Sequence, residues 1–430
     1  MIKQKLLATT ALVSLVAGSA FAGGPAPSMH NDMSVKIGGM YDAQLLARSL
    51  KNKGVTQLST NNENKAIDTK AQVFIEAKNS TAKGLEYGAH IGLSTNTSNN
   101  KNPNSGIDRS WLWMEHADMG RVEFGSNNDV SESMRIGADR VATATGGISG
   151  DWFKILNSSV FTAAAGGASF TEFHLSPWSV GDNELDLVSL GTNTHNEKAR
   201  KINYYSPKMN GFQAGVSYTA DTAHTGATAG LPNTEVGATN AAGAYNVVSA
   251  GLTWEGKMTN DIMTSLSAVT MHGKVRNAAV SATAQSRNIS AFDLGGMISY
   301  NKMKAAVSYG HTAKTGFLKA TTGVALKDSW YATAGASYEF DKFVTSLTYM
   351  HGNKNKNKSD VVSLGADYHL ASGIMPYAEI THFKGKLTNT GGHATKVTSA
   401  TSGILAVSAA AETNNKASGT AFIIGTKLSF

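Results

Sequence analysis

Short segments in which apolar and polar residues alternate recur along almost the whole chain. In the first of them, residues 34–48, one face would carry Val35, Ile37, Tyr41, Ala43 and Leu45, and the other face Lys36, Asp42 and Gln44. Because successive side chains of a strand point to opposite faces, this alternation predicts a strand with one apolar and one polar face. Similar segments predict sixteen strands in all, at 34–48, 68–78, 85–93, 109–118, 120–127, 199–206, 211–220, 245–256, 261–272, 289–301, 304–312, 328–340, 342–351, 359–371, 374–385 and 417–430.

The connections between these strands alternate in length. Short turns, such as 80–83, 119–120, 207–210 and 257–260, alternate with long polar stretches at 49–65, 96–107, 221–244, 273–288, 313–327 and 386–415. Short turns at one end and long loops at the other are typical of membrane barrels, and strands of about ten residues can cross a bilayer when tilted. The final strand ends on Phe430, and pairing it with the first strand would remove both sheet edges. We therefore predict an all-β protein, a transmembrane antiparallel 16-stranded β-barrel. A soluble β-sandwich is the alternative, and it would need several separate cores for a chain of this length.

The start of the chain and its composition restrict the class further. Residues 1–22 have the pattern of a signal peptide, with Lys3 and Lys5, an apolar run and a small-residue cleavage site, so we expect residues 23–430 to form one barrel. The absence of cysteine excludes a disulfide scaffold and a thiolate metal site. The formal net charge is +7, but the basic residues are scattered, which argues against nucleic acid as a partner.

Three segments resemble the Gram-negative general porins. They are Met-Gly-Arg-Val-Glu-Phe-Gly at 119–125, the stretch 204–218 that begins Tyr-Tyr-Ser-Pro, and the C-terminal strand that ends on Phe430. The resemblance implies a homotrimer in the outer membrane, in contact with outer-membrane lipid and lipopolysaccharide, that lets ions and small hydrophilic solutes diffuse through. It also implies that the third long loop folds into the lumen as a constriction. Phe430 would then be the signal that the barrel-assembly machinery reads.

The third long loop, residues 128–198, should carry the function. It holds nine acids and four bases, a net charge of −5. We expect its acidic residues to line a constriction and basic residues on inward strand faces to form an opposing wall, which would create a transverse field across the pore. The acidic candidates are Glu132, Asp139, Asp151, Asp182, Glu184 and Asp186, and the basic candidates are Lys36, Lys70, Lys78, Arg121 and Lys201. Solvated loop acids are the alternative. The basic total favours anions and the acidic loop favours cations, so selectivity stays open with a slight preference for cations.

Other chemistry has weaker support. The group Asp182, Glu184 and Asp186 is a weak candidate for structural Ca²⁺, because it lacks the spacing of a known calcium loop; no other cofactor is expected. We predict Leu112 and Met114 on the lipid face, with Trp111, Trp113 and Glu115 in the lumen. No Gly-x-Ser-x-Gly motif or His-x-x-x-His pair is present, so we do not expect an enzyme. The alternatives are a substrate-selective uptake channel for a sugar or an anion, an adhesin, or a barrel hydrolase. The hydrolase candidates are His311, His351, His382 and Asp360.

Overall fold

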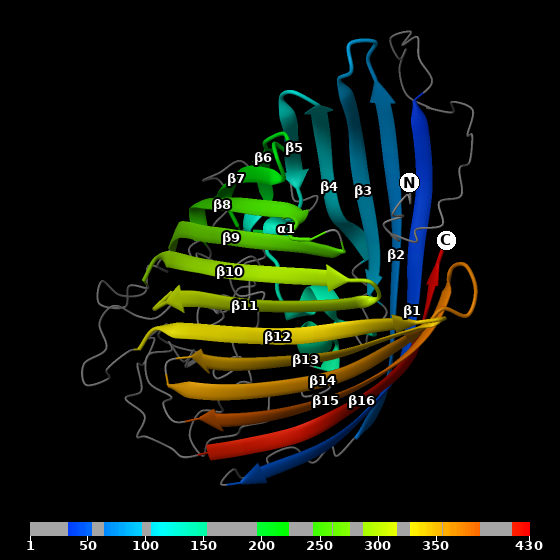
Figure 1. The fold of residues 1–430 in the computed structure, drawn as a ribbon, viewed down its shortest axis with the longest axis vertical. Helices are drawn as coiled ribbons and strands as arrows, with labels where there is room; N and C mark the ends of the chain where they lie inside the picture. The colour runs from blue at the N-terminus through cyan, green and yellow to red at the C-terminus, as the bar shows by residue number, and fades with distance from the viewer. Residues whose placement is uncertain are drawn as a thin grey trace, which may run out of the picture.

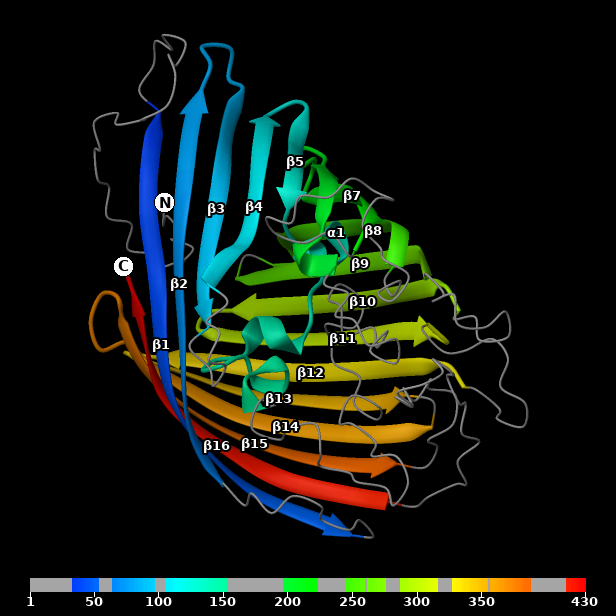
Figure 2. The same ribbon diagram turned by 180° about the vertical axis from the view of Figure 1, so that it is seen from behind.

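The computed structural model describes residues 33–53, 64–96, 105–152, 196–222, 244–259, 261–275, 287–315, 327–354, 356–387 and 415–430. The predicted signal peptide, residues 1–22, lies outside these ranges. Sixteen antiparallel strands close into one barrel (Figures 1 and 2). They are β1 Ser34–Lys53, β2 Lys65–Ser80, β3 Glu86–Asn96, β4 Ser105–His116, β5 Gly120–Ser126, β6 Arg200–Tyr205, β7 Phe212–Asp221, β8 Ala244–Lys257, β9 Ile262–Val275, β10 Ile289–Tyr300, β11 Met303–Ala313, β12 Ser329–Phe340, β13 Phe343–Lys354, β14 Asn357–Tyr368, β15 Ile374–Leu387 and β16 Asn415–Ser429. Every predicted strand is present, so the prediction of the fold class is confirmed.

The barrel closes where the first and last strands pair. Met40 of β1 lies opposite Ser429 of β16, and the pairing continues to Lys53 opposite Lys416. At the end of the chain, Phe430 and Gly39 exchange two backbone hydrogen bonds, of 3.1 Å and 2.9 Å. Both strand edges are therefore occupied along this seam, and an exposed ladder that could pair with another chain is avoided.

The predicted faces are also confirmed. Leu112 and Met114 of β4 are exposed on the outside, whereas Trp113 is 4% exposed. In β16, Phe422 and Ile424 point outward and the intervening Ile423 is buried. The apolar face thus surrounds the barrel, which is the arrangement that lipid requires. Among the described residues, no helix is both long and apolar enough to span a membrane.

Two rows of outward aromatic rings mark the ends of this apolar face. Near the short turns, which we call the short-turn end, Tyr338, Phe340, Phe343 and Tyr368 form a chain of ring contacts. At the opposite, long-loop end, a second chain of ring contacts runs over β10 to β13 and consists of Phe292, Tyr309, His311, Trp330 and His351. Aromatic girdles at both membrane interfaces are expected for a barrel in lipid, so the two rows indicate where the bilayer ends.

After β5 the chain turns into the barrel instead of crossing its rim. It forms α1 (Val130–Met134), η1 (Ala138–Val141) and η2 (Gly147–Ser149), and it returns to the wall through η6 (Asn196–Lys198). Figure 2 shows these short helices inside the barrel. Helix α1 contacts β7 to β9, η1 contacts β11 to β13, and η2 contacts β13 to β15. We call residues 128–152 the inner strap, because they follow the inner wall across most of its strands.

Candidate functional site: the inner strap

A single lysine joins the two ends of the third loop. Lys201 of β6 points inward, and its ammonium group donates to the carbonyl oxygens of Asn127, Asn196 and Ala199, the last two at 2.6 Å. The Ser126 hydroxyl also donates a hydrogen bond to the Lys198 carbonyl oxygen. Lys201 is 4% exposed, so its charge lies beneath the loop instead of facing the water of the pore. This residue of the expected basic wall therefore closes the base of the loop.

Asp129 fixes the first turn of the strap. Its Oδ1 accepts from the Glu132 amide at 3.0 Å and from the Ser131 hydroxyl at 2.9 Å, which caps α1. Its Oδ2 accepts from Ser249 of β8 at 2.6 Å and from Asn196 at 2.7 Å. One fully buried carboxylate therefore connects the helix, the wall and the returning end of the loop.

Beyond α1, the backbone of the strap donates to side chains of successive wall strands. The Ile136 amide donates to Ser267 of β9 at 3.0 Å, and the Ala138 amide to Thr333 of β12 at 3.2 Å. Two further amides donate to β13, from Thr143 to Ser346 at 2.9 Å and from Ile148 to Thr348 at 3.2 Å. The inward serines and threonines thus satisfy amides that have no ladder partner, which a buried irregular segment requires.

Charged wall residues bind the far end of the strap. Glu379 of β15 accepts from the amide and hydroxyl of Thr145, at 3.1 Å and 2.8 Å, and from the Gly147 amide at 3.3 Å. The Lys427 ammonium group donates to the Ala144 carbonyl. Gln44 of β1 then donates to Asp151 at 2.6 Å. The strap therefore connects β7 to β1 along the inside of the barrel.

Glycines on the wall let the strap approach closely. Inward positions on β7, β8, β10, β12 and β14 lack a side chain where the strap crosses, at Gly215, Gly251, Gly295, Gly335 and Gly365. A methyl group built on Gly295 would lie 1.7 Å from the Ile136 carbonyl oxygen, and one built on Gly215 would lie 2.7 Å from the Met134 sulfur. The backbone of the strap therefore fills the space that side chains would take.

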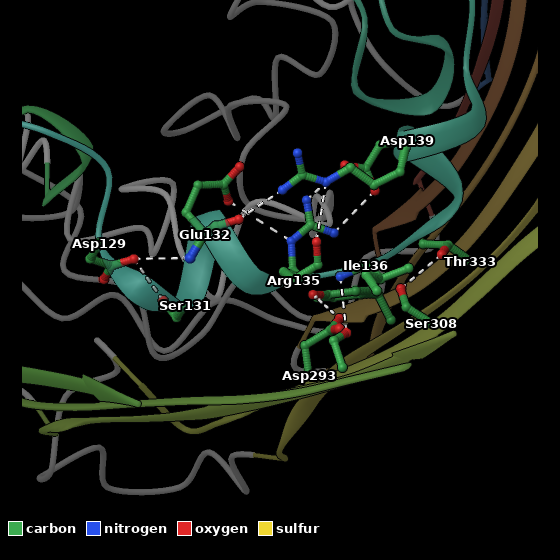
Figure 3. Close-up of polar contacts among 12 residues, drawn as sticks. Asp129, Ser131, Glu132, Arg135, Ile136, Asp139, Asp293, Ser308 and Thr333 are labelled. Atoms are coloured by element: carbon green, nitrogen blue, oxygen red, sulfur yellow. Dashed lines mark hydrogen bonds and ion pairs between the residues drawn. The ribbon is translucent and has the colours of Figure 1, made fainter. Parts of the chain in front are cut away.

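Three of the six acidic candidates lie on the strap, and two of them belong to an ion-pair cluster. The Arg135 guanidinium donates to both oxygens of Asp139, at 3.1 Å and 2.8 Å, and lies 3.9 Å from Glu132 (Figure 3). Arg140 donates to the carbonyls of Glu132 and Arg135, at 2.8 Å and 3.1 Å. The Arg135 side chain has no exposed surface. The cluster thus braces the bend between α1 and η1.

The surroundings shift the pKa values of this cluster in opposite directions. Burial raises the pKa of Glu132, and Arg135 and Arg140 offset only part of that shift. Burial would also raise the pKa of Asp139, but the paired Arg135 outweighs it, so that this pKa lies below its usual value. The pKa of Arg135 is raised, because its two carboxylates outweigh the cost of burial. The Arg135–Asp139 pair is therefore charged at neutral pH.

The basic candidates on β1, β2 and β5 lie on the same inner wall, but they are not alone there. Lys78 pairs with Glu86 at 2.7 Å, and Arg121 pairs with Glu123 at 2.7 Å and Glu115 at 3.1 Å. The sequence analysis placed Glu115 in the lumen, but it paired none of these three acids with the basic wall, although Glu86 and Glu123 also have the inward phase of their strands. This wall therefore has mixed charge.

Lys36 and Lys70 also occupy inward positions on the wall. Both are exposed, and each lies opposite an acid across β1 and β2, with Lys36 facing Glu76 and Asp42 facing Lys70. The candidates Asp182, Glu184 and Asp186 fall outside the described residues, and so does the calcium site predicted from them.

The hydrolase candidates lie on the outer face, at the long-loop end. His351 contacts Asp360 at 2.7 Å, and the same oxygen accepts from Tyr349 at 2.8 Å. In the part of the chain that the structure describes, no serine or threonine hydroxyl bonds to His351, whereas His382 contacts Thr420 and His311 lies 3.6 Å from Asp328. The candidates are thus distributed over separate contacts and do not form one nucleophile–base constellation.

Comparisons with known proteins agree with this architecture. The sequence profile of the Gram-negative porins matches residues 8–388. An uncharacterized protein of Rickettsia felis is 28% identical over 430 residues, which cover 89% of this chain and 94% of that protein. One of Rickettsia bellii is 27% identical over 475 residues, which cover 99% and 100%.

Solved structures show the same fold. An anion-selective porin from Comamonas acidovorans has a TM-score of 0.55 and 15% identity over 93% of this chain and 100% of its own. Salmonella typhi OmpF, in complex with daunomycin, has a TM-score of 0.55 and 10% identity over 93% and 98%. These likenesses concern the fold, whereas the sequence profile covers most of the chain. The protein therefore belongs to the Gram-negative porin family.

Proposed function

We propose that this protein is an outer-membrane diffusion channel, a homotrimer, in which the inner strap narrows the pore for ions and small hydrophilic solutes. The observation that supports this proposal is the course of the strap, which is bonded to inward side chains from β8 to β15 and to Gln44 of β1. A segment held inside a closed barrel reduces its open cross-section, so solutes would be sieved by size. Short turns would face the periplasm, and long loops the exterior.

Charge on the two sides of the passage would tune this sieve. Residues 129–151 of the strap carry four acids and two bases, a net charge of 2 − 4 = −2. The opposite wall offers exposed Lys36 and Lys70 together with the Lys78–Glu86 pair. Fixed charges across a narrow aqueous passage bias which ions enter. Because the wall is mixed and the strap is acidic, we propose a weak preference for cations.

Single-channel recording with engineered cysteines tests the proposal directly. The natural chain has no cysteine, so each variant would carry a single reactive thiol. Lys36→Cys places that thiol on the inner face, and the neighbouring Ile37→Cys places it on the lipid face. We expect stepwise three-level conductance from the natural protein, and a charged thiol reagent should reduce conductance only in Lys36→Cys. An inserted, folded barrel that does not conduct, or an equal effect at both positions, would contradict the proposal.

A further inference from the structure

The outer face of the barrel carries a group of lysines at the long-loop end of β14, β15, β16 and β1. Five lysines line one recess of about 470 Å³, together with Asp360, Gly385 and Ser418. We call the five the lysine patch: Lys51, Lys358, Lys384, Lys386 and Lys416. All five are exposed. The porin fold and the inner strap leave this group unexplained.

The phase of each strand places the patch on the lipid side of the wall. In β15, Lys384 and Lys386 share their face with Ile380, which is exposed, whereas the intervening Phe383 is buried inside. In β14, Lys358 continues the outward column that contains Leu364. Alternation along a strand requires these side chains to point away from the lumen. The lysines are thus outside the pore and directly beyond the apolar face.

Strand pairing fixes the height of the patch relative to the aromatic row. His351, which belongs to that row, lies opposite Asp360, and Asp360 lies opposite Lys384. Lys384 in turn lies opposite Ser418, which lies opposite Lys51. Aromatic side chains of such rows sit at the level of the lipid head groups. The patch therefore continues the same level around the part of the barrel where the row of rings ends.

The charge of the patch is not balanced within the described residues. Lys386 lies opposite Lys358 on one side and opposite Lys416 on the other. Like charges directly opposite one another destabilise a sheet. No carboxylate lies within 4.0 Å of these five ammonium groups in the described part of the chain.

The one acid of the recess does not relieve this repulsion. Asp360 is hydrogen-bonded to Tyr349 and His351 through the same oxygen. The eight lining residues therefore have a net charge of 5 − 1 = +4. Anions supplied from outside the chain would lower the repulsion.

We propose that the lysine patch binds the phosphate groups of anionic lipid heads in the leaflet at the long-loop end. Lysine binds phosphate as a mobile point charge, and several lysines around one recess can share one head group. Each lysine near an anionic membrane surface strengthens association by about fivefold. The patch would select the lipids next to β14–β1 and fix the depth of the barrel. It does not depend on conduction through the pore.

Native mass spectrometry of the full chain from nanodiscs can test this proposal. The nanodiscs would contain equal amounts of phosphatidylglycerol and phosphatidylcholine, and the lipids retained by each barrel would be counted. The patch variant replaces Lys358, Lys384, Lys386 and Lys416 with glutamine. The control makes the same charge change at the short-turn end, replacing the exposed Lys83, Lys257, Lys302 and Lys342 with glutamine.

We expect the natural protein and the control variant to retain phosphatidylglycerol preferentially. In the patch variant, the ratio of retained phosphatidylglycerol to phosphatidylcholine should fall by at least about fivefold. An unchanged preference in the patch variant, or an equal loss in the control, would overturn the proposal. Inorganic phosphate, compared with chloride at the same ionic strength, distinguishes the two sources of phosphate. Binding of inorganic phosphate at the patch, together with no preference for phosphatidylglycerol over phosphatidylcholine, would indicate a site for the free ion and would also refute lipid binding.

Discussion

Replacing Gly295 with alanine tests whether the strap lies in a track shaped by wall glycines. The added methyl carbon would stand 1.7 Å from the Ile136 carbonyl oxygen. Real Cβ atoms essentially never approach another heavy atom more closely than 3.0 Å. The strap would have to retreat by at least 3.0 − 1.7 = 1.3 Å. Such a shift would stretch the neighbouring bond from the Ile136 amide to Ser267, which is now 3.0 Å.

The loss of stability follows from overpacking, because the added methyl group meets backbone atoms of the strap and not a flexible side chain. Overpacking costs about 1–3 kcal/mol. If the free energy of local opening falls by that amount, hydrogen exchange at the strap amides becomes roughly 5- to 150-fold faster. Hydrogen exchange measured by mass spectrometry on peptides that cover residues 130–148 would report it. Single-channel current should also become noisier, because a loosened strap would sample more positions.

The neighbouring glycine supplies the matched control. Gly296 lies on the same strand but faces lipid, and a methyl group there would meet its nearest atom, of Leu266, at 3.2 Å. Gly296→Ala should leave strap exchange and current noise close to those of the natural protein. Unchanged exchange in Gly295→Ala, or an equal increase in both variants, would refute the idea that the strap is seated against the wall at this point.

Four further predictions concern the charged contacts of the strap. Lys201→Met removes the donor shared by three carbonyls, and it should accelerate exchange at 127–129 and 196–199, whereas Lys36→Met should not. Arg135→Met leaves buried carboxylates unpaired, and it should destabilise strap docking by about 3–5 kcal/mol, measured by the same exchange. The third prediction is acid sensitivity, since the pKa of Asp139 is lowered. Its pair stabilises the strap above the ordinary aspartate pKa of about 4, and that contribution is lost as the pH falls through the lower folded pKa. Asp139→Asn should therefore dock weakly at pH 7 and should lack the additional loss that the natural protein shows below about pH 4. The pKa of Glu132 is raised by burial, so its charged carboxylate weakens docking of the strap at high pH. Glu132→Gln should therefore strengthen docking at high pH, and this difference from the natural protein should shrink on acidification.

The strands could be predicted because one physical constraint acts on each of them separately. Every strand must present apolar residues to lipid at alternate positions. The number of strands and the outward face of each can therefore be predicted without knowing which strands are neighbours. Strand ends were less exact, since the ladder extends beyond the alternating part. The first strand was expected to end at residue 48, for example, and it continues to Lys53. The polar residues past that point lie above the apolar face, where alternation carries no signal.

The course of the strap could not be predicted from local pattern. Its partners on the wall, such as Ser267, Thr333 and Glu379, look in the sequence like ordinary polar residues of a water-filled lumen. Only the closed sheet reveals that they lie in the order in which the strap meets them. The same holds for Gly295, because an inward glycine acquires a meaning only when a second backbone is placed against it. Long-range contacts of this kind join residues more than 130 positions apart.

The way the strap is attached also explains how an irregular segment can be held inside a hydrated pore. Its apolar side chains pack in two clusters, one around Val130 and Met134 and one that joins Ala138, Ala144, Ile148 and Trp152 to wall residues such as Phe383. Alongside these clusters, single hydrogen bonds to the wall succeed one another, each worth only about 1 kcal/mol. Because these bonds lie on strands of one closed sheet, the wall presents all the acceptors in a fixed arrangement, and losing one leaves the others in place. A passage bounded in this way keeps its width through rigid geometry instead of through a large core. We therefore expect single wall substitutions to change the noise and selectivity of the channel before they change the stability of the barrel.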